Sequence, residues 1–316
     1  MKKKIFIILL VSIMVLLSSC GEKETEPESV WPENPIEVIV PYNPGSDADT
    51  FANGLITYLS EDLGVDITIT TMTGSSGTVA SNYIRNDASS SGYKVLFWNT
   101  AILTNSIYGL SDYSYEAFTD ACTVIEDSSY YIFASPKFGS LKALTEFAKK
   151  NPGAVTIGCT TDSFNRLCTQ IVLSVLDIEV TPVDFPSYED AADGIASGKV
   201  DFFIGSSEQV KDHISASYIV PVACIGEKST ALPDVETLME LGYDKIRVKQ
   251  IYGFFFPKET DRRVVDLFNK SISKCANYDE FRNFCRSHGA DVSINYLMEA
   301  ENIWKSELDY YRVFLK

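Results

Sequence analysis

The sequence is poor in positive charge and in histidine, and its longest apolar run is short. Lys and Arg number 27 against 43 Asp and Glu, which gives a formal net charge of -16. Nucleic-acid-binding proteins neutralise phosphates with clustered Lys and Arg, so this balance argues against nucleic acid as a partner. The simplest role of the excess acidic residues is solubility.

Several motifs of enzymes and metal sites are also absent. No two cysteines stand two residues apart, and no His-Glu-x-x-His or Gly-x-Ser-x-Gly sequence occurs. The only histidines, His213 and His288, lie in a charged run and at an expected helix end, so both are expected at the surface. We therefore expect no catalytic residue, cofactor or metal. An exported α/β enzyme stays an alternative, which turnover of a bound compound would support.

The N-terminus has the form of an export signal. Three lysines follow Met1, an apolar run extends over residues 5–17, and Leu17-Ser-Ser-Cys20 follows. A transmembrane anchor is the alternative, but the run is too short to span a bilayer comfortably. The Leu17-Ser-Ser-Cys20 sequence resembles a bacterial lipobox, which implies cleavage before Cys20 and its lipidation. Residues 1–20 are then a lipoprotein signal peptide, and the polar residues 21–30 a flexible tether.

The remaining cysteines have no paired spacing, and several lie in apolar surroundings. This favours buried free thiols over disulfides. An exported protein could still pair some of them, and Cys275 with Cys285 is the pair that the sequence leaves open. The six residues are Cys122, Cys159, Cys168, Cys224, Cys275 and Cys285.

From residue 31 onward, strand-like and helix-like segments alternate, which is typical of an α/β fold with a largely parallel sheet. In the first expected helix, Phe51, Leu55 and Leu59 recur at every fourth position and form one buried stripe. We expect strands at 36–41, 65–71, 94–98, 130–134, 154–159, 180–185, 200–204, 219–225 and 252–256, and helices at 47–63, 78–87, 141–151, 164–177, 188–197, 264–275, 279–288 and 297–315.

Two crossings divide this series into two lobes with a cleft between them. We expect the chain to cross near 124–131 and near 218–225. Residues 31–125 and 225–316 then form the first lobe, and residues 126–224 form the second. Clefts between lobes are common binding sites for small molecules.

The first candidate site lies where the first strand meets the first helix. Ser46 and Asp49 have the spacing of a capping box, in which the Ser46 hydroxyl accepts from the amide of residue 49 and the Asp49 carboxylate accepts from the amide of residue 46. Asp49 is thus expected to lock the loop. Pro44 and Gly45 allow a close approach of the backbone to a guest and are expected to aim amide groups into the cleft.

Other strand ends also carry small polar residues. The loop Thr73-Gly-Ser-Ser-Gly-Thr78 can wrap a carboxylate or phosphate with its amides and with the Ser75 or Ser76 hydroxyl, although such loops are also common surface turns. It lacks the Gly-Lys-Ser/Thr of a nucleotide-binding loop. Further polar corners are Asn99-Thr100, Thr160-Thr-Asp-Ser163 with Asn165 and Arg166, and Ser187-Tyr-Glu-Asp190.

The order of these segments resembles that of the tripartite tricarboxylate transporter substrate-binding proteins, also called the Bug family. The opening Trp31-Pro-Glu-Asn-Pro-Ile-Glu-Val-Ile-Val-Pro-Tyr-Asn-Pro-Gly-Ser-Asp-Ala-Asp49 is similar to that family's first strand and loop. The likeness covers nearly the whole mature chain in order. It continues through Gly74-Ser-Ser-Gly-Thr78, Ser91-Gly-Tyr93, residues 147–153, Gly198-Lys-Val-Asp201, Leu232-Pro-Asp-Val-Glu-Thr237 and Tyr252-Gly-Phe-Phe-Phe-Pro257.

The resemblance implies a type II periplasmic-binding-protein fold that closes on a small organic acid and delivers it to the two subunits of a membrane permease. A receptor that signals to a membrane partner instead of feeding a permease is an alternative that the sequence does not separate. We expect a monomer. Carried over by position, the ligand-binding residues are Tyr42, Pro44, Gly45, Ser46, Gly74, Ser75, Ser76, Gly77, Thr78, Asn99, Thr100, Thr161, Ser163, Asn165, Arg166, Asp184 and Phe185.

The sequence departs from the family pattern in charge. Ser46 replaces a loop glycine, Asn53 replaces an arginine, and Asp184-Phe-Pro-Ser187 replaces Pro-Tyr-Lys-Gly. Asp47, Asp162 and Asp184 therefore place extra negative charge near the expected cleft. Since like charges repel, we hypothesise a zwitterion or a monocarboxylate as the ligand rather than a citrate-like acid.

Overall fold

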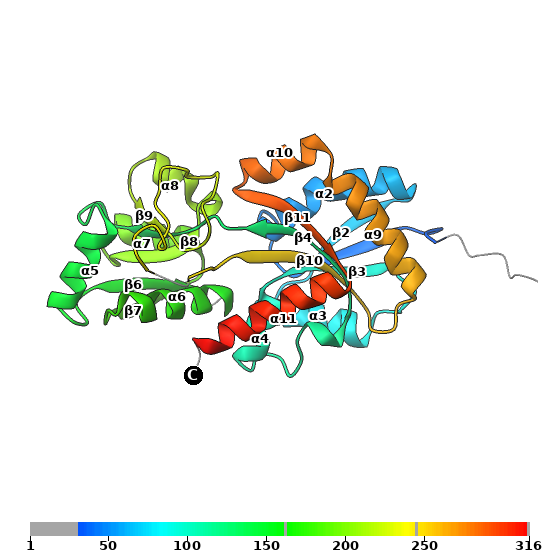
Figure 1. Ribbon diagram of the computed structural model, residues 1–316, viewed down its shortest axis with the longest axis horizontal. Coiled ribbons are helices and arrows are strands. Elements are labelled where there is room, and N and C mark those ends of the chain that lie inside the picture. The colour runs from blue at the N-terminus through cyan, green and yellow to red at the C-terminus, as the bar shows by residue number, and fades with distance from the viewer. Residues whose placement is uncertain (1–30, 161–162, 244–245, 315–316) are drawn as a thin grey trace, which may run out of the picture.

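The computed structural model describes residues 31–160, 163–243 and 246–314. Its strands form two sheets, one in each of two lobes that lie side by side (Figure 1). The larger sheet has the order β11-β4-β10-β3-β1-β2 and the smaller the order β7-β6-β8-β5-β9. The predicted signal peptide, the predicted tether and Cys20 fall outside the described residues. Across the described residues, no helix has the length and apolarity needed to cross a bilayer.

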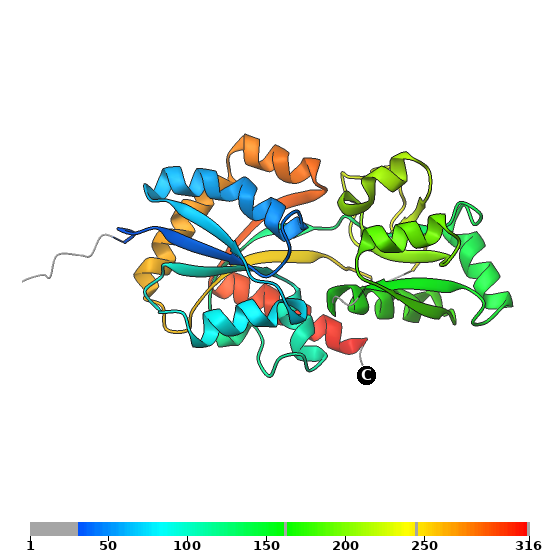
Figure 2. The same cartoon turned by 180° about the vertical axis from the view of Figure 1, so that it is seen from behind.

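In the first lobe, helices cover both faces of the large sheet. One face carries α2, α9 and α10, and the other carries α3, α4 and α11 (Figures 1 and 2). The strands are β1 (Ile36–Val40), β2 (Ile67–Thr71), β3 (Lys94–Asn99), β4 (Thr119–Asp127), β10 (Gln250–Phe256) and β11 (Ala290–Tyr296). The helices are α2 (Asp47–Leu63), α3 (Thr78–Asn86), α4 (Ala101–Ile107), α9 (Arg262–Ala276), α10 (Asp279–Ser287) and α11 (Met298–Val313).

The second lobe is a smaller α/β unit. Its strands are β5 (Tyr130–Ala134), β6 (Thr156–Thr160), β7 (Thr181–Phe185), β8 (Phe202–Ser206) and β9 (Val220–Cys224). Its helices are α5 (Leu141–Lys150), α6 (Ser163–Leu176), α7 (Tyr188–Ala196) and α8 (Lys211–Ser215), with the short turn η3 (Glu208–Val210) before α8. The chain enters this lobe between Asp127 and Tyr130 and leaves it after Cys224.

Helix α2 illustrates how the sequence sets the elements. Ser46 caps its first turn by accepting from the amide of Asp49 at 3.3 Å, and Gly64 ends it in the left-handed conformation at φ 71°. Phe51, Leu55 and Leu59 are buried against the sheet. The predicted stripe therefore faces the core of the first lobe.

The expectation of a largely parallel arrangement is wrong, because both sheets are mixed. Strand β1 pairs parallel with β2 and β3, and β6 pairs parallel with β7 and β8. The strands next to the crossings, β4, β5, β9 and β10, instead pair antiparallel with their neighbours, as does β11 with β4. Each lobe thus combines parallel βα units with strands that run to or from the other lobe.

All six cysteines of the described residues are free, and five of them are buried. Cys275 and Cys285 lie in the neighbouring helices α9 and α10 without a bond between them. Burial raises the pKa of both thiols, to about 11 for Cys275 and about 12 for Cys285, which keeps them protonated at neutral pH.

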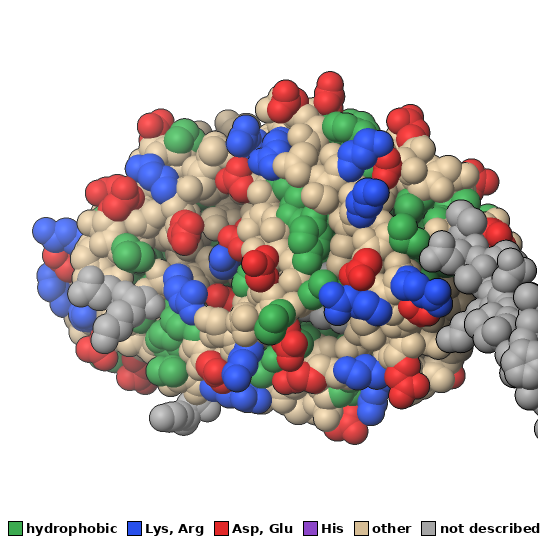
Figure 3. Space-filling model, turned by 45° about the vertical axis from the view of Figure 1, so that its right-hand side comes forward, with side chains coloured by type: hydrophobic (Ala, Val, Ile, Leu, Met, Phe, Trp, Pro, Cys, Tyr) green, Lys and Arg blue, Asp and Glu red, His purple; other side chains and the backbone are tan. Residues whose placement is uncertain are grey.

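On the face seen in Figure 3, acidic and basic side chains are interspersed.

Candidate functional site

A cleft of about 700 Å³ lies between the two lobes, at the ends of strands from both sheets. This position follows from the fold, because loops after parallel strands meet at one edge of a sheet and leave helix N-termini facing that edge. The lining residues are Pro41, Tyr42, Asn43, Pro44, Gly45, Ser46, Asp47, Ala48, Thr50, Thr73, Gly74, Ser75, Ser76, Gly77, Asn99, Tyr130, Thr160, Pro186, Ser187, Tyr188, Glu189, Glu208, Gln209, Lys211, Asp212, His213, Gln250 and Tyr252.

The first loop, residues 41–46, is held by hydrogen bonds within itself. The Gly45 amide donates to Asp49 Oδ2 at 2.8 Å, and the Ser46 amide donates to the Asn43 carbonyl at 3.1 Å. Asn53 Nδ2 also donates to Asp49 Oδ1 at 3.1 Å. The Asp49 carboxylate therefore ties down the loop, but it accepts from residue 45 rather than from residue 46. The Gly45 amide, which was expected to face a guest, is thereby engaged by Asp49, and the Ser46 amide bonds Asn43 instead of Asp49.

The second loop, residues 73–77, has an unusual backbone. Gly74, Ser75, Ser76 and Gly77 all have positive φ, at 132°, 46°, 51° and 91°. This conformation costs about 1–2 kcal/mol for each non-glycine residue, so the loop stores strain. Among the described residues, the amides of Gly74, Ser75 and Ser76 have no acceptor. Consecutive amides on one concave turn are a common anion-binding arrangement.

Contacts with neighbouring residues hold this strained loop in place. Asn105 Nδ2 donates to the Ser76 carbonyl at 2.8 Å. Gly77 lies directly against Trp98, since a Cβ at residue 77 would come within 2.8 Å of the indole nitrogen. Only glycine suits both this approach and a φ of 91°. The second glycine of the Gly-Ser-Ser-Gly pattern is therefore required for this loop conformation.

A small network joins the first loop to the end of β3. The Tyr42 hydroxyl donates to Asn99 Oδ1 at 2.9 Å and accepts from Trp98 Nε1 at 3.3 Å. Asn99 Oδ1 also accepts from the Ala101 amide at 3.0 Å. Because Trp98 also packs under Gly77, one buried indole supports both loops, which places them at the same end of the cleft.

Nine of the predicted ligand-binding residues lie in the cleft lining, and their contact with a ligand stays a prediction. They all come from the first lobe: Tyr42, Pro44, Gly45, Ser46, Gly74, Ser75, Ser76, Gly77 and Asn99. Thr78 begins α3 just behind this lining and is buried. Thr100 is also buried, and its hydroxyl accepts from the Ile251 amide at 2.9 Å.

The predicted residues of the second lobe lie elsewhere. Ser163 Oγ donates to Asn105 Oδ1 at 2.8 Å, so it joins α6 to α4 of the other lobe. Asn165 is buried and bonds the Thr160 amide and the Ile204 carbonyl. Arg166 is exposed, with its guanidinium 4.2 Å from the centre of the Tyr108 ring. Helix α6 thus contacts the other lobe and turns these side chains away from the cleft. Thr161 lies outside the described residues.

The other two predicted positions, in β7, also lie outside the lining. Asp184 is exposed on this edge strand, and Phe185 is buried against Gly194 beneath Lys199. Of the three aspartates that the sequence placed near the cleft, Asp47 lines it, Asp184 does not, and Asp162 is outside the described residues.

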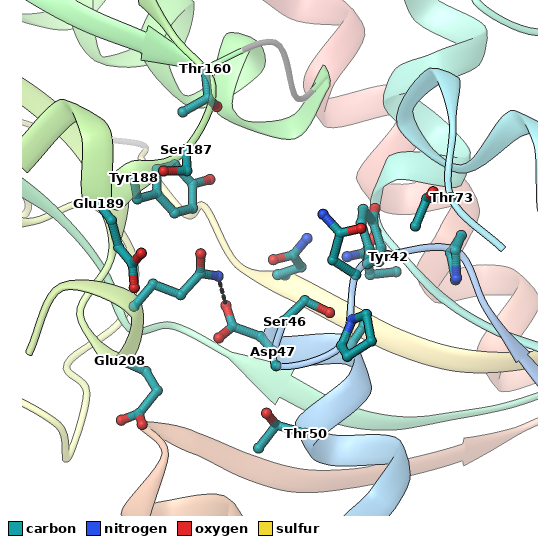
Figure 4. A pocket seen from close by; sticks show the side chains of 18 of the residues that line it. Tyr42, Ser46, Asp47, Thr50, Thr73, Thr160, Ser187, Tyr188, Glu189 and Glu208 are labelled. Carbon is teal, nitrogen blue, oxygen red and sulfur yellow. Dashed lines mark hydrogen bonds between the residues drawn. The ribbon is translucent and has the colours of Figure 1, made fainter. Parts of the chain in front are cut away.

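The second lobe contributes other residues to the lining (Figure 4). The β7–α7 corner supplies Pro186 to Glu189; this corner was predicted from the sequence to be polar but not to bind the ligand. The segment after β8, which was not predicted as part of a site, supplies Glu208, Gln209, Lys211, Asp212 and His213, and the rule that ligands bind beyond strand ends points to it as well. His213 was expected at the surface, yet it is half-buried and lines the cleft, with Nε2 2.9 Å from Asp193 Oδ1.

Two carboxyl groups are buried near the crossing between the lobes. Asp47, the first residue of α2, is 9% exposed, and its Oδ2 accepts from Gln209 Nε2 of the second lobe at 2.9 Å (Figure 4). Burial raises its pKa, Glu208 adds to the effect, and His288, Gln209 and Ser206 oppose it. Asp127 is 1% exposed, and burial together with the charge of Asp47 raises the pKa of Asp127 to about 7.

The crossing residues of the cleft are tyrosines and a glutamine. The Tyr130 and Tyr252 hydroxyls both donate to Gln250 Oε1. Burial raises the pKa of both tyrosines well above 10, so both stay neutral. Within the described residues, no cluster of three or more His, Cys, Asp and Glu is placed to hold a metal ion.

Two α/β lobes, two crossing segments and a polar cleft at the strand ends define a solute-binding protein of the periplasmic type II class. The family model described as "Tripartite tricarboxylate transporter family receptor" matches residues 52–307. The chain belongs to this family of extracytoplasmic solute-binding receptors, as its motifs predicted.

Curated relatives cover most of the chain. Protein BugT of Bordetella pertussis is 24% identical over 272 residues, which are 84% of this chain and 83% of that protein. A protein encoded in the tcbD-tcbE intergenic region of a Pseudomonas species is 25% identical over 252 residues, 77% of this chain and 74% of that protein.

Solved structures share the fold. The periplasmic binding protein BugD has a TM-score of 0.75 at 23% identity, with 90% of this chain and 96% of that chain covered. MatC from Rhodopseudomonas palustris with bound malate has a TM-score of 0.76 at 18% identity, covering 90% and 100%. An R. palustris protein with adipate, Rpa4515, has a TM-score of 0.78 at 19% identity, covering 90% and 97%.

Proposed function

We propose that this receptor captures a small carboxylate-bearing organic acid outside the cytoplasmic membrane and delivers it to a tripartite-type permease. Family membership and the polar interlobe cleft support this function. Two proteins of the same fold have malate and adipate bound, which are small organic acids. Among the described residues, no hydrogen bond joins the cleft histidine His213 to a serine, threonine or cysteine, so the geometry offers no activated nucleophile that would support catalysis.

The observation that carries the proposal is the strained loop of residues 73–77. Its amides at Gly74, Ser75 and Ser76 lack acceptors, and the loop lines the cleft. The first turn of α2 adds the amides of Asp47 and Ala48, which also have no acceptor among the described residues. A ligand carboxylate would accept from the amides of residues 74–76 without any arginine or lysine.

Calorimetric titration with mono-, di- and tricarboxylates tests the binding step. At least one acid should bind with a dissociation constant in the micromolar range. Ser76→Ala removes a hydroxyl but keeps the amides, so it should weaken binding less than about tenfold. Gly77→Ala distorts the loop and should abolish binding. The opposite order, with Ser76→Ala as the damaging change, would show that the hydroxyl holds the acid instead.

The anchor and the delivery step need separate experiments. We infer lipidation at Cys20, so protein extracted from its own membranes should begin at Cys20 with the mass of an attached lipid. An intact N-terminus would contradict this inference. Deletion of the receptor should abolish uptake of the bound acid by whole cells. Normal uptake combined with a lost transcriptional response to the acid would instead support a sensing receptor.

A further inference from the structure

The cleft carries more negative charge than its own side chains neutralise. Its acidic residues are Asp47, Glu189, Glu208 and Asp212, and its one lysine is Lys211. Lys211 Nζ lies 2.6 Å from Glu208 Oε1, so Glu208 already neutralises the charge of Lys211. In residues 31–160, 163–243 and 246–314, no Lys or Arg forms an ion pair with the other three acids.

Asp47 differs from the other cleft acids because it is buried. It is 9% exposed, and its burial is offset by the neutral Gln209 amide and the Ser206 hydroxyl, with a smaller influence from the charge of His288. The helix N-terminus at which it lies favours its negative charge. An ionised carboxylate in such a place is costly unless it is paired with a positive charge. No Lys or Arg of the described residues forms an ion pair with Asp47, so a cationic group of a bound molecule would stabilise its ionised form.

Aromatic rings line the cleft on the side of the second lobe and the crossings. Tyr130, Tyr188 and Tyr252 all belong to the lining, and the rings of Tyr130 and Tyr188 lie 6.4 Å apart at 82°. The faces of such rings attract cations. Thr160 adds a buried hydroxyl oxygen that has no hydrogen-bond partner in the described part of the chain. These groups suit a cationic nitrogen with an attached apolar part.

The positive and negative groups of a ligand would bind in different parts of the cleft. Figure 4 shows Asp47 on the side that faces Glu189 and Glu208, and Thr73, where the second loop begins, on the other side of Tyr42. The amides of residues 74–76, which have no acceptor among the described residues, follow Thr73 directly in the chain. The cleft therefore has an acidic side, at Asp47, Glu189 and Glu208, and a separate side at the second loop.

We propose that the ligand is a zwitterion, whose cationic nitrogen pairs with Asp47 while its carboxylate accepts from the amides of the second loop. The inference rests on the proposed function and specifies its substrate class. A dicarboxylate would bring a second negative group towards Asp47, Glu189 and Glu208 and meet no free cation. The Gln209 side chain of the second lobe donates to Asp47. It would therefore orient the Asp47 carboxylate towards the cationic nitrogen of the ligand.

The test compares amino acids with the acids that lack only the amino group. The full mature chain is titrated by calorimetry with L-glutamate and glutarate, L-leucine and 4-methylpentanoate, and β-alanine and propionate. At least one amino compound should bind tenfold or more tightly than its partner acid. Removal of one member of a buried charge pair is costly, so Asp47→Asn should weaken that compound at least about 30-fold. The partner acid should bind Asp47→Asn equally well or better.

Asp87→Asn is the matched control, because it removes a negative charge from an exposed side chain outside the cleft lining. It should leave every affinity within about twofold. Comparison of the wild-type affinities remains decisive even when Asp47→Asn folds poorly. Binding of the acids with no advantage for the amino compounds overturns the zwitterion inference and leaves the proposed function standing. Failure of the whole panel to bind contradicts both.

Discussion

Ser163 at the start of α6 and Thr104 in α4 share a hydrogen bond of 2.7 Å between their hydroxyls, which joins the two lobes behind the cleft. Ser163 Oγ also donates to Asn105 Oδ1 at 2.8 Å, and all three side chains are buried. Tyr108 donates to Gln170 between the same two helices at 2.5 Å. This polar contact therefore positions the lobes and uses a serine that the sequence assigned to the ligand.

Ser163→Ala should destabilise the protein by about 1–3 kcal/mol, because it leaves the buried Thr104 and Asn105 groups without their partner. Urea unfolding followed by circular dichroism measures the change. Ser174→Ala in the same helix is the control, since Ser174 Oγ bonds only the Ile171 carbonyl of its own helix, and it should cost less than about 0.5 kcal/mol. Unchanged stability with a large loss of ligand affinity in Ser163→Ala would restore the role predicted from the sequence.

Gly77→Ala should cost about 2–4 kcal/mol, because the new Cβ meets Trp98 Nε1 at 2.8 Å and φ is 91°. Gly153→Ala separates these two causes. Gly153 has φ 75° but no atom within 4 Å of its Cβ position, so only the backbone cost of about 1–2 kcal/mol remains. Thermal or urea unfolding of both variants measures the difference. Equal losses would mean that Trp98 moves aside at no cost.

Local sequence signals were sufficient for most elements of the fold. The helix at residues 47–63 was predicted from its apolar period and its Ser46 cap, and the structure has these same bounds. Strands β4 and β11 and helices α4 and α8 were missed, and β4 and α4 show why. Strand β4 is long because it pairs with both β10 and β11, and α4 is one short helix buried by α6 and α11. Both depend on distant partners, which a local pattern does not contain.

The site was predictable in the first lobe only. There each loop directly follows a strand of the parallel set, so position along the chain indicated position in the cleft. In the second lobe, α6 begins after a similar corner but packs on α4, and the cleft residues come from the segments after β7 and β8. Which of the three strand ends faces the other lobe depends on how the lobes dock, so the strand-end rule names the candidate segments but does not choose among them.

Asp49→Ala should loosen the first loop, because it removes the acceptor of the Gly45 amide and of Asn53 Nδ2. We expect a loss of about 1–2 kcal/mol in unfolding free energy and weaker ligand binding through the displaced Tyr42–Ser46 segment. Asp49→Asn keeps one acceptor oxygen and should recover most of both. Unfolding curves and titrations of the two variants provide the check. A tenfold gain in affinity for anionic acids in Asp49→Asn would instead place this carboxylate against the ligand.

Asp127→Asn should remove a pH dependence of stability. Because burial and Asp47 raise the pKa of Asp127 from 3.8 to about 7, the folded protein binds more protons than the unfolded chain between these values. Stability contributed by this group is therefore greatest near pH 4 and falls as pH rises towards 7, by up to about 1.4 kcal/mol per pH unit. In Asp127→Asn, Oδ1 can still accept from the Ser129 amide and hydroxyl. At pH 8 the Asp127→Asn variant should be more stable than wild type, and at pH 5 it should lose that advantage. Urea unfolding at both pH values measures the difference. The control variant Asp184→Asn should have the same pH dependence as wild type. Parallel curves for wild type and Asp127→Asn would mean that the carboxylate is ionised in the folded protein and solvated from the cleft.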